Sequence, residues 1–442
     1  MKNAVNRRDF LKGAAGAGLG YWVANQYSRG QEGSPPSEKL NIAIVGVTGR
    51  GGDNINELES EAAGLFNIVA LCDVDDNFLK SVGPRYPKAK TYNDYRKMLE
   101  QKDVEAVLCA TADHAHAWVT LASLRSGRHV YCEKPLAHSV EEIRLVTETA
   151  KREKKVTQMG TQIHALSNYR RVVEVIQSGA IGPVNEVHVF IEKAWYQDKE
   201  PRMGVPVPPN LHWDLWQCAV PERPYSPDYL PANWRRFWAY GEGTLGDMGC
   251  HLIDLPTWAL GLTRPTKIHA EGPEVHPDWC PKWVTVQYDY PARGDQPPVK
   301  LHWYDGGKKP ELAESLDLRK HKLAHMAIVF VGEKGTLAAD YDKYKLFPEE
   351  KFADFKAPPQ TIAPSPGHHK EWILGCMKND PTAPLCNFSY SGPLAENVLL
   401  GTVAYRTGEA IDWNPEQLAV TNTPKAEEFL KLKYKDGWSL GA

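Results

Sequence analysis

The sequence has no excess of charge of either sign and no long apolar run beyond its first 24 residues. Its 52 basic and 55 acidic side chains nearly cancel, leaving a formal net charge of −3. This balance argues against nucleic acid or an anionic membrane surface as a partner. No later run approaches the ~20 apolar residues of a membrane-spanning helix, so we expect no integral membrane span. At 442 residues the chain is long enough for two domains.

The sequence also lacks closely spaced cysteines. Its eight cysteines are scattered, without a C-x-x-C pair. We therefore predict buried core thiols, with neither a disulfide framework nor a metal site. Cys376 and Cys386 are the only pair close enough in sequence to suggest a bridge.

The N-terminal residues have a definite order. The stretch NRRDFLKG begins at Asn6, and an almost uncharged run of Ala, Gly and Leu follows it to Ala24. This layout is typical of a twin-arginine signal, with an ordinary basic arm as the alternative. We expect the protein to be periplasmic or otherwise exported. Because no Ala-x-Ala cleavage site follows, an uncleaved signal that tethers the protein to the membrane is also open. Residues 1–38 are assigned to this signal and a linker.

Residues 39–157 show the alternation of strands and helices that predicts a Rossmann domain with a doubly wound parallel sheet. Leu40–Val45 suits a buried parallel strand, and the turn GVTGRG that follows it opens a helix. In such a turn, backbone N–H groups approach a dinucleotide pyrophosphate. The predicted contacts are Gly46, Thr48, Gly49, Arg50 and Gly51, with Thr48 standing where the fingerprint has its second glycine.

Asp73 follows the second expected strand and lies 22 residues after Gly51. A carboxylate at about this spacing accepts both ribose hydroxyls and repels a 2′-phosphate, so the sequence favours NAD over NADP. Further strands are expected over 104–111 and 128–132, with a helix over 92–100 between the second and third strands. A Rossmann-like domain for another ligand is the alternative.

Two short motifs carry candidate chemistry. Lys134, in the triplet Glu133-Lys134-Pro135 after a strand, can stabilise a developing alkoxide. In GTLGDMGCHLID, a helix from about residue 246 places Asp247 and His251 on one face, with Asp254 three residues further along it. Such a pair can orient a substrate and accept its proton. A solvated Lys, a capping Asp and a core His are the alternatives, and two residues are too few for a metal site.

Together, GVTGRGG, Asp73, CATADHAHAW, CEKPLA and GDMGCHLID resemble the glucose-fructose oxidoreductase and inositol dehydrogenase family, written Gfo/Idh/MocA. The resemblance implies homodimers or homotetramers, and a carbohydrate or cyclitol substrate. It implies that Lys134 is catalytic, that Asp247 holds the substrate and that His251 transfers the proton. It also implies cofactor contacts for Thr111, His116, Glu133, Lys134 and Pro135. Ala112 departs from the family pattern, which has proline after the threonine.

Residues 158–442 predict an α+β domain with a broad, mostly antiparallel sheet. Strands are expected over 159–164, 267–271, 284–290, 299–304, 327–331 and 336–340, with a half-exposed strand after Gly182. Helices are expected over 167–178, 368–380 and 393–408. The segment 308–322 is expected to be a solvated, mobile insertion. Of the six tryptophans between 195 and 258, Trp213 and Trp234 are the candidates for a sugar-stacking role, although most should be core residues.

Three functions are compatible with these motifs. The first is an NAD-dependent oxidoreductase that moves a hydride between a sugar or cyclitol hydroxyl carbon and nicotinamide. The second is an exported glycoside hydrolase or lyase that uses tightly bound NAD in a cycle of oxidation, elimination and reduction. The third is a sugar-binding protein without catalysis, against which the set Lys134, Asp247 and His251 argues.

Overall fold

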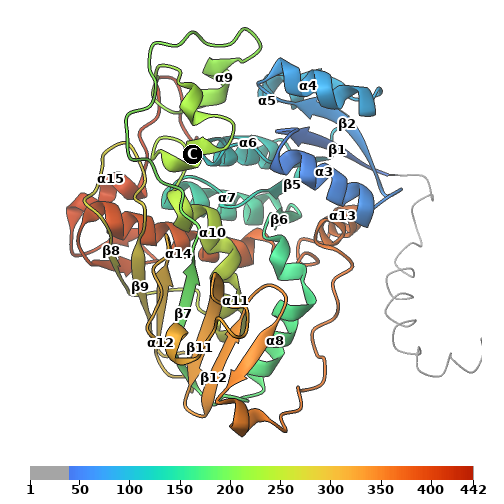
Figure 1. Ribbon diagram of the computed structural model, residues 1–442. Coiled ribbons are helices and arrows are strands. Elements are labelled where there is room, and N and C mark those ends of the chain that lie inside the picture. Colours follow the sequence, from blue (N-terminus) through green and yellow to red (C-terminus); the bar gives the residue numbers. More distant parts are fainter. Residues whose placement is uncertain (1–38, 442) are drawn as a thin grey trace, which may run out of the picture. The chain divides into compact units, whose positions relative to one another are not determined.

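The computed structural model describes residues 39–441, which therefore exclude the twin-arginine motif. Within this range the chain forms two sheets, one of six strands and one of nine (Figure 1). The first is entirely parallel, with strand order β3-β2-β1-β4-β5-β6. Its strands are β1 (Leu40–Val45), β2 (Phe66–Cys72), β3 (Lys90–Tyr92), β4 (Ala106–Cys109), β5 (His129–Cys132) and β6 (Thr157–Met159). This confirms the predicted Rossmann sheet.

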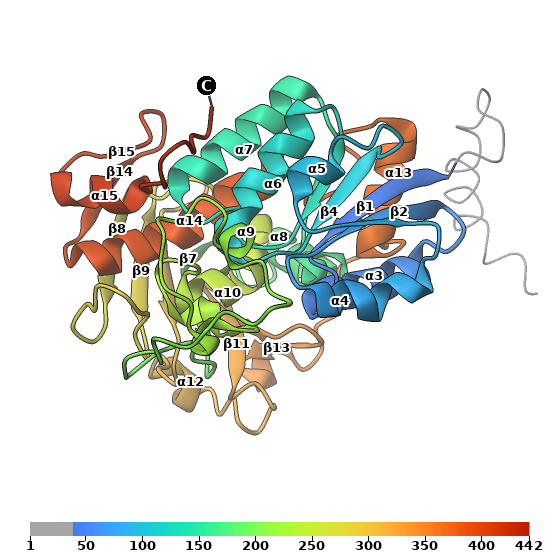
Figure 2. The ribbon, with the colours of Figure 1, turned by 90° about the horizontal axis from the view of Figure 1, so that it is seen from above.

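Helices cover both faces of the first sheet (Figure 2). α3 (Arg50–Glu61) and α13 (His368–Lys378) lie on one face, and α6 (Asp113–Arg125) and α7 (Val140–Glu153) lie on the other. Between β2 and the third central strand, the expected helix over 92–100 is only the short α5 (Tyr95–Met98), preceded by β3; α4 (Asp76–Val82) follows β2. Strand order reverses between β1 and β4, which is where ligands of such folds bind.

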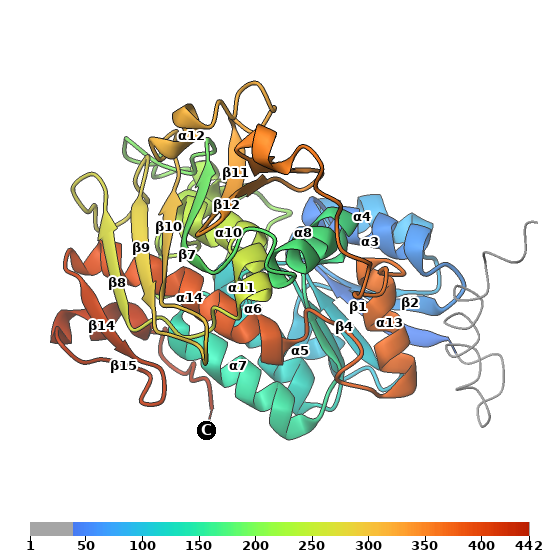
Figure 3. The same ribbon diagram turned by 90° about the horizontal axis from the view of Figure 1, so that it is seen from below.

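The second sheet is mostly antiparallel, as predicted, with order β13-β12-β11-β7-β10-β9-β8-β14-β15 (Figure 3). Only β7 and β10 among its described neighbours run parallel. Its strands are β7 (Val184–Ile191), β8 (Lys267–Glu271), β9 (Thr285–Tyr290), β10 (Val299–Tyr304), β11 (Met326–Gly332), β12 (Gly335–Ala339), β13 (Tyr344–Phe347), β14 (Ile411–Asn414) and β15 (Ala419–Val420).

One face of the second sheet packs on helices. These are α8 (Ser167–Gln177), α10 (Gly243–Leu252), α11 (Asp254–Leu260) and α14 (Phe388–Thr407). Short helices α9 (Trp213–Gln217), α12 (Leu312–Ser315) and α15 (Glu427–Leu430) complete the described set.

The predicted domain boundary after residue 157 falls inside β6, and α13 returns from the C-terminal half to pack on α3. None of the helices within 39–441 has the length and apolarity to cross a bilayer.

Several local expectations are wrong, each for a packing reason. The strand expected over 159–164 ends at Met159, because Gly160 lies against the Glu133 side chain and a 3₁₀ turn follows. β7 is largely buried because helices cover one face of the sheet, and Leu318 and Leu323 pack on Phe190 at the other face. The segment 308–322 is anchored rather than freely solvated, since Leu318 and neighbouring Leu323 are buried in an apolar cluster with the second sheet.

The cysteines lie in the core, as the sequence predicts. All eight are buried and unpaired, including Cys376 and Cys386.

Candidate active site

The glycine-rich turn after β1 is shaped by close backbone packing. A Cβ on Gly46 would lie 2.5 Å from the carbonyl oxygen of Ala110, which follows β4. A Cβ on Gly51 would lie 1.9 Å from the carbonyl oxygen of Gly46. Neither position tolerates a side chain, and Gly46 also has a positive φ of 83°. The first and third fingerprint glycines are thus required, while Thr48 occupies a position with room for a side chain.

A cavity of about 480 Å³ opens at this edge of the first sheet, a volume within the range of small-molecule sites. Of the residues predicted to contact the cofactor, its walls include Gly46, Thr48, Gly49, Arg50, Asp73 and Thr111. Gly51, His116 and the triplet Glu133-Lys134-Pro135 do not line it. The cavity therefore brings together the turn and the strand-end carboxylate, as a dinucleotide requires.

Asp73 is held by backbone groups at the end of β2. Its carboxylate accepts hydrogen bonds from the Val47 N–H at 2.9 Å and the Asp75 N–H at 3.0 Å. Burial raises the pKa of Asp73 to about 6, against the opposing effect of these two bonds. The carboxylate is fixed in place at the cavity wall, where it can accept ribose hydroxyls.

The carboxylate of Asp247 contacts residues that follow strands of both sheets, and together they form one charged cluster. α10, which carries it, lies between the two sheets (Figure 1). Lys134 Nζ, just after β5, donates to Asp247 Oδ1 and to the Asp247 backbone oxygen, both at 2.7 Å. Arg235 Nε donates to Oδ1 at 3.1 Å, and Oδ2 accepts from Trp195 Nε1 at 2.7 Å and lies 2.8 Å from Lys193 Nζ.

These neighbours determine the charge of Asp247. Burial alone would raise its pKa, but Lys134, Arg235 and Lys193 lower it well below the usual value. Three cations around one carboxylate leave the cluster positive. Asp247 therefore holds the Lys134, Arg235 and Lys193 cations close together.

His251 lies one turn after Asp247 on α10, as the spacing predicts. Its Nδ1 atom is buried and has no hydrogen-bond partner. Burial lowers the pKa of His251 to about 3, and the positive charge of Lys134 adds to the effect. The imidazole is therefore neutral at physiological pH, and one ring nitrogen carries a lone pair, although so low a pKa makes it a weak base. Asp254 departs from the prediction: it begins α11 and contacts His164 at 3.0 Å, away from this pair.

Glu133 ties the triplet to the glycine turn. Its Oε1 accepts from Arg50 Nε at 3.2 Å, Asn54 Nδ2 at 2.9 Å and Gln162 Nε2 at 2.9 Å. Arg50 itself also bonds to Glu57 on α3. Glu133 is 4% exposed. It thus fixes the start of α3 against the end of β5.

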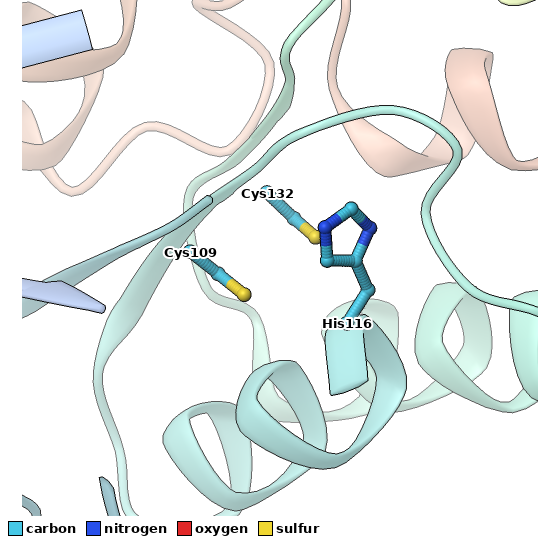
Figure 4. Close-up of side chains that lie close together, drawn as sticks. All are labelled: Cys109, His116 and Cys132. Carbon is cyan, nitrogen blue, oxygen red and sulfur yellow. The ribbon is translucent and has the colours of Figure 1, made fainter. Parts of the chain in front are cut away.

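His116 is buried in the first turn of α6, next to Cys109 and Cys132 (Figure 4). Its Nδ1 lies 2.6 Å from the Pro135 carbonyl oxygen and its Nε2 lies 3.1 Å from that of Thr111. His116 therefore supports the two segments that carry Thr111 and the triplet, from behind the cavity. A direct contact of His116 with the cofactor stays a prediction.

The two candidate tryptophans occupy different places. Trp234 lines the cavity and is 5% exposed, with the Arg235 guanidinium 4.1 Å from its ring centre. Trp213 does not line it; its ring stacks on Trp216 with centroids 4.7 Å apart. Trp213 belongs to an aromatic cluster behind the cavity, whereas Trp216 is in the lining.

Sequence reasoning missed Lys193, Trp195 and Arg235. They lie in KAWY after β7 and in NWRR, two short runs of basic and aromatic residues. No motif spacing links either run to Asp247 on α10. The alternation of basic and aromatic residues was the available signal. Only the fold shows that side chains from both runs contact the Asp247 carboxylate.

Comparison with known proteins places this geometry in context. Residues 40–161 match the model of the Gfo/Idh/MocA "oxidoreductase family, NAD-binding Rossmann fold", and residues 167–296 match that family's "C-terminal alpha/beta domain".

Relatives with similar sequences include inositol 2-dehydrogenases. The one from Salmonella paratyphi B is 33% identical over 151 residues, which is 34% of this chain and 45% of that protein. The one from Rubrobacter xylanophilus is 26% identical over 221 residues, which is 50% of this chain and 60% of that protein. The chain thus spans about half the length of these relatives.

Solved structures share the fold across most of the chain. The WlbA dehydrogenase from Bordetella pertussis, in complex with NADH and UDP-GlcNAcA, has a TM-score of 0.60 and 17% identity, covering 85% of this chain and 99% of that one. Levoglucosan dehydrogenase in complex with NADH has a TM-score of 0.55 and 14% identity, covering 85% and 99%. At these identities the likeness shows the fold.

Proposed function

The chain belongs to the Gfo/Idh/MocA oxidoreductase family, and from this and the geometry of its site we propose that it transfers a hydride between NAD and the hydroxyl-bearing carbon of a sugar or cyclitol. The contact of Lys134 Nζ with Asp247 Oδ1 at 2.7 Å carries the proposal. It brings the strand-end lysine and the α10 carboxylate together beside a cavity suited to a dinucleotide. The inositol dehydrogenases among the relatives support the substrate class.

The cavity residues fit NAD. The glycine turn leaves its backbone open toward the pyrophosphate, and Asp73 would hold the adenosine ribose. NAD, when bound, supplies the nicotinamide carbon that accepts or returns the hydride. Arg50 is engaged by Glu133 and Glu57, which leaves it poorly placed to recognise a 2′-phosphate.

The chain's own residues handle the proton and the charge. Asp247 fixes the Lys134 ammonium, which donates to the substrate oxygen and stabilises its negative charge. His251 is the residue to which the family resemblance assigns the hydroxyl proton, and its neutral ring offers a lone pair for it. Asp247 holds Lys134 in place, and the substrate-holding role that the family resemblance implies for Asp247 stays a prediction.

The test is NAD reduction by a panel of polyols and sugars, with Lys134→Ala compared with the exposed-lysine control Lys102→Ala. We expect Lys134→Ala to lower kcat by at least about 100-fold and to leave NAD binding nearly unchanged. Equal turnover in the two variants would show that Lys134 is not a catalytic residue. Loss of NAD binding together with turnover would make Lys134 a cofactor residue only.

We also propose export by the twin-arginine route, on the basis of NRRDFLKG. The check is a fusion of residues 1–38 to a folded reporter, with Arg7→Lys/Arg8→Lys as the control. Export that persists in the double variant would contradict the proposal. Because free NAD is scarce outside the cytoplasm, an exported enzyme should carry its cofactor, and mass spectrometry of the denatured protein should find about one NAD per chain.

We further propose that the chain assembles into homodimers or homotetramers. The support for this proposal is the chain's membership of the Gfo/Idh/MocA family. Light scattering after size-exclusion chromatography measures the mass. A monomer at micromolar concentration would contradict this.

A further inference from the structure

We propose that Glu186, His188 and His302 bind a divalent transition-metal cation of the zinc class. The site would lie on the second sheet, on the face away from α10 and α14. Glu186 and His188 are two residues apart on β7, so their side chains leave the same face. β10 pairs with β7 in parallel, with His302 directly opposite His188. This proposal is independent of the hydride transfer described above.

The three ligand atoms already have the spacing of a metal site. Glu186 Oε1 lies 3.3 Å from His188 Nε2 and 3.2 Å from His302 Nε2, and all three atoms lie within 4.8 Å of one another. A tetrahedral zinc ion with bonds of about 2.1 Å separates its ligand atoms by about 3.4 Å. His302 Nε2 is buried and faces Glu186 Oε1 at 3.2 Å, so a cation held between these two atoms would take the place of their direct contact.

The neighbouring side chains orient both imidazoles so that their Nε2 atoms face one point. The two rings stack with centroids 5.0 Å apart and planes at 16°, and both Nε2 atoms approach the same carboxylate oxygen. On the other side of His188, Nδ1 lies 3.2 Å from the hydroxyl of Tyr304. A proton held on Nδ1 by this hydroxyl leaves the Nε2 lone pair free, which is the usual arrangement of a histidine ligand.

The site also has an entry. The Glu186 side chain is 41% exposed, whereas those of His188 and His302 are 11% and 18% exposed. A cation can therefore arrive from solvent at the carboxylate and be held by two sheltered nitrogens. Water would complete a fourth position, as in zinc sites with three protein ligands.

The second cluster of this kind, Cys109, His116 and Cys132, differs on these points (Figure 4). Both ring nitrogens of His116 already face carbonyl oxygens, and all three side chains are buried. Neither ring nitrogen of His116 is open to an incoming cation, so Glu186, His188 and His302 form the better metal site.

The experiment is a titration of the purified full-length protein, stripped with a chelator, with Zn²⁺ in the presence of a chromophoric competitor. Co²⁺ absorption reports the ligand geometry. We expect one Zn²⁺ per chain to be bound at this site, and at least tenfold weaker binding in His188→Gln, His302→Gln and the half-exposed Glu186→Gln. His269→Gln is the matched control, because His269 Nε2 lies 3.3 Å from Glu271 Oε1 on β8, yet among residues 39–441 that pair has no third ligand in reach.

The outcomes separate clearly. Circular dichroism and the thermal midpoint in chelator show whether each variant is folded, and Glu186→Gln, being half-exposed, guards against a folding failure of the histidine variants. Unchanged Zn²⁺ affinity in all three ligand variants would place the metal elsewhere and overturn the proposal. Absence of Zn²⁺ binding to the unaltered protein would overturn it equally. A tenfold loss shared by His269→Gln would show nonspecific surface binding.

Discussion

At the scale of single residues, Asp73 should determine which dinucleotide is bound. Its carboxylate faces the cavity, and a 2′-phosphate there would meet a negative charge. We expect Asp73→Ala to weaken NADH binding by about tenfold, since one or two hydrogen bonds to hydroxyls are lost, and to reduce discrimination against NADPH. Fluorescence titration with both cofactors measures this. Asp75→Asn removes a charge from the same cavity while keeping an α4 cap; an equal effect there would show that charge alone matters.

Asp113 gives a pH prediction at the same scale. It is 3% exposed, and burial raises its pKa to about 8 against the pull of Arg235 and Lys134. The unfolded chain loses this proton near pH 4, whereas the folded chain keeps it to about pH 8, so rising pH lowers stability between these values. Asp113→Asn removes this dependence. The free energy of unfolding of Asp113→Asn, relative to that of the unaltered protein, should therefore rise by up to about 1.4 kcal/mol for each pH unit in this range. Urea unfolding of both proteins at pH 5 and pH 7 measures this difference. An equal difference at the two pH values would show that Asp113 is ionised in the folded state and would contradict the prediction.

The sequence revealed the residues that belong to local motifs. Gly46, Gly51 and Asp73 have a fixed spacing, and Lys134 and His251 stand in short recognisable strings. Lys193 and Arg235 contact the same carboxylate, but no spacing rule links them to Asp247, because their positions depend on how a long loop folds back on α10.

At the scale of elements, the placement of α10 rests on a glycine. A Cβ on Gly249 would lie 2.8 Å and 3.0 Å from the two γ-methyl groups of Val398 on α14. Alanine favours a helix by up to about 1 kcal/mol over glycine, but overpacking costs about 1–3 kcal/mol, so we expect Gly249→Ala to be net destabilising. It should also lower turnover by shifting Asp247. In Gly52→Ala on α3, the nearest atom lies 3.6 Å away, and denaturant unfolding should show no loss; equal losses would contradict the packing argument.

Strands with a clear apolar run or alternation were predictable, including the four-residue β4 and β5, whereas β13 and β14 were not. Leu40–Val45, Lys267–Glu271 and Val299–Tyr304 have the predicted bounds. β13 and β14 have four residues each, too few for an alternation to be distinguished from a loop, and they are strands only because a neighbour pairs with them.

At the scale of the whole molecule, the C-terminal segment returns to the first domain and closes the cofactor cavity. Trp438 lines this cavity, packs edge-on against Trp118 with centroids 5.0 Å apart, and lies 5.2 Å from the Arg96 guanidinium. Tyr434 also packs on Trp118, and its hydroxyl donates to Glu142 at 2.9 Å. The N-terminal dinucleotide domain is therefore completed by the last residues of the chain, which the motif pattern of residues 39–157 could not show.

This arrangement predicts that cofactor affinity depends on the end of the chain. Trp438→Ala should lower the free energy of unfolding by about 1–3 kcal/mol, from lost apolar burial and aromatic packing, and should weaken NADH binding several-fold because one wall of the cavity is lost. The exposed Lys433→Ala is the control in the same segment. Calorimetric NADH titration and urea unfolding together separate the two effects. Reduced stability with unchanged NADH affinity would mean that Trp438 supports α6 without shaping the site, and removal of residues 432–442 should then leave NADH affinity unchanged as well.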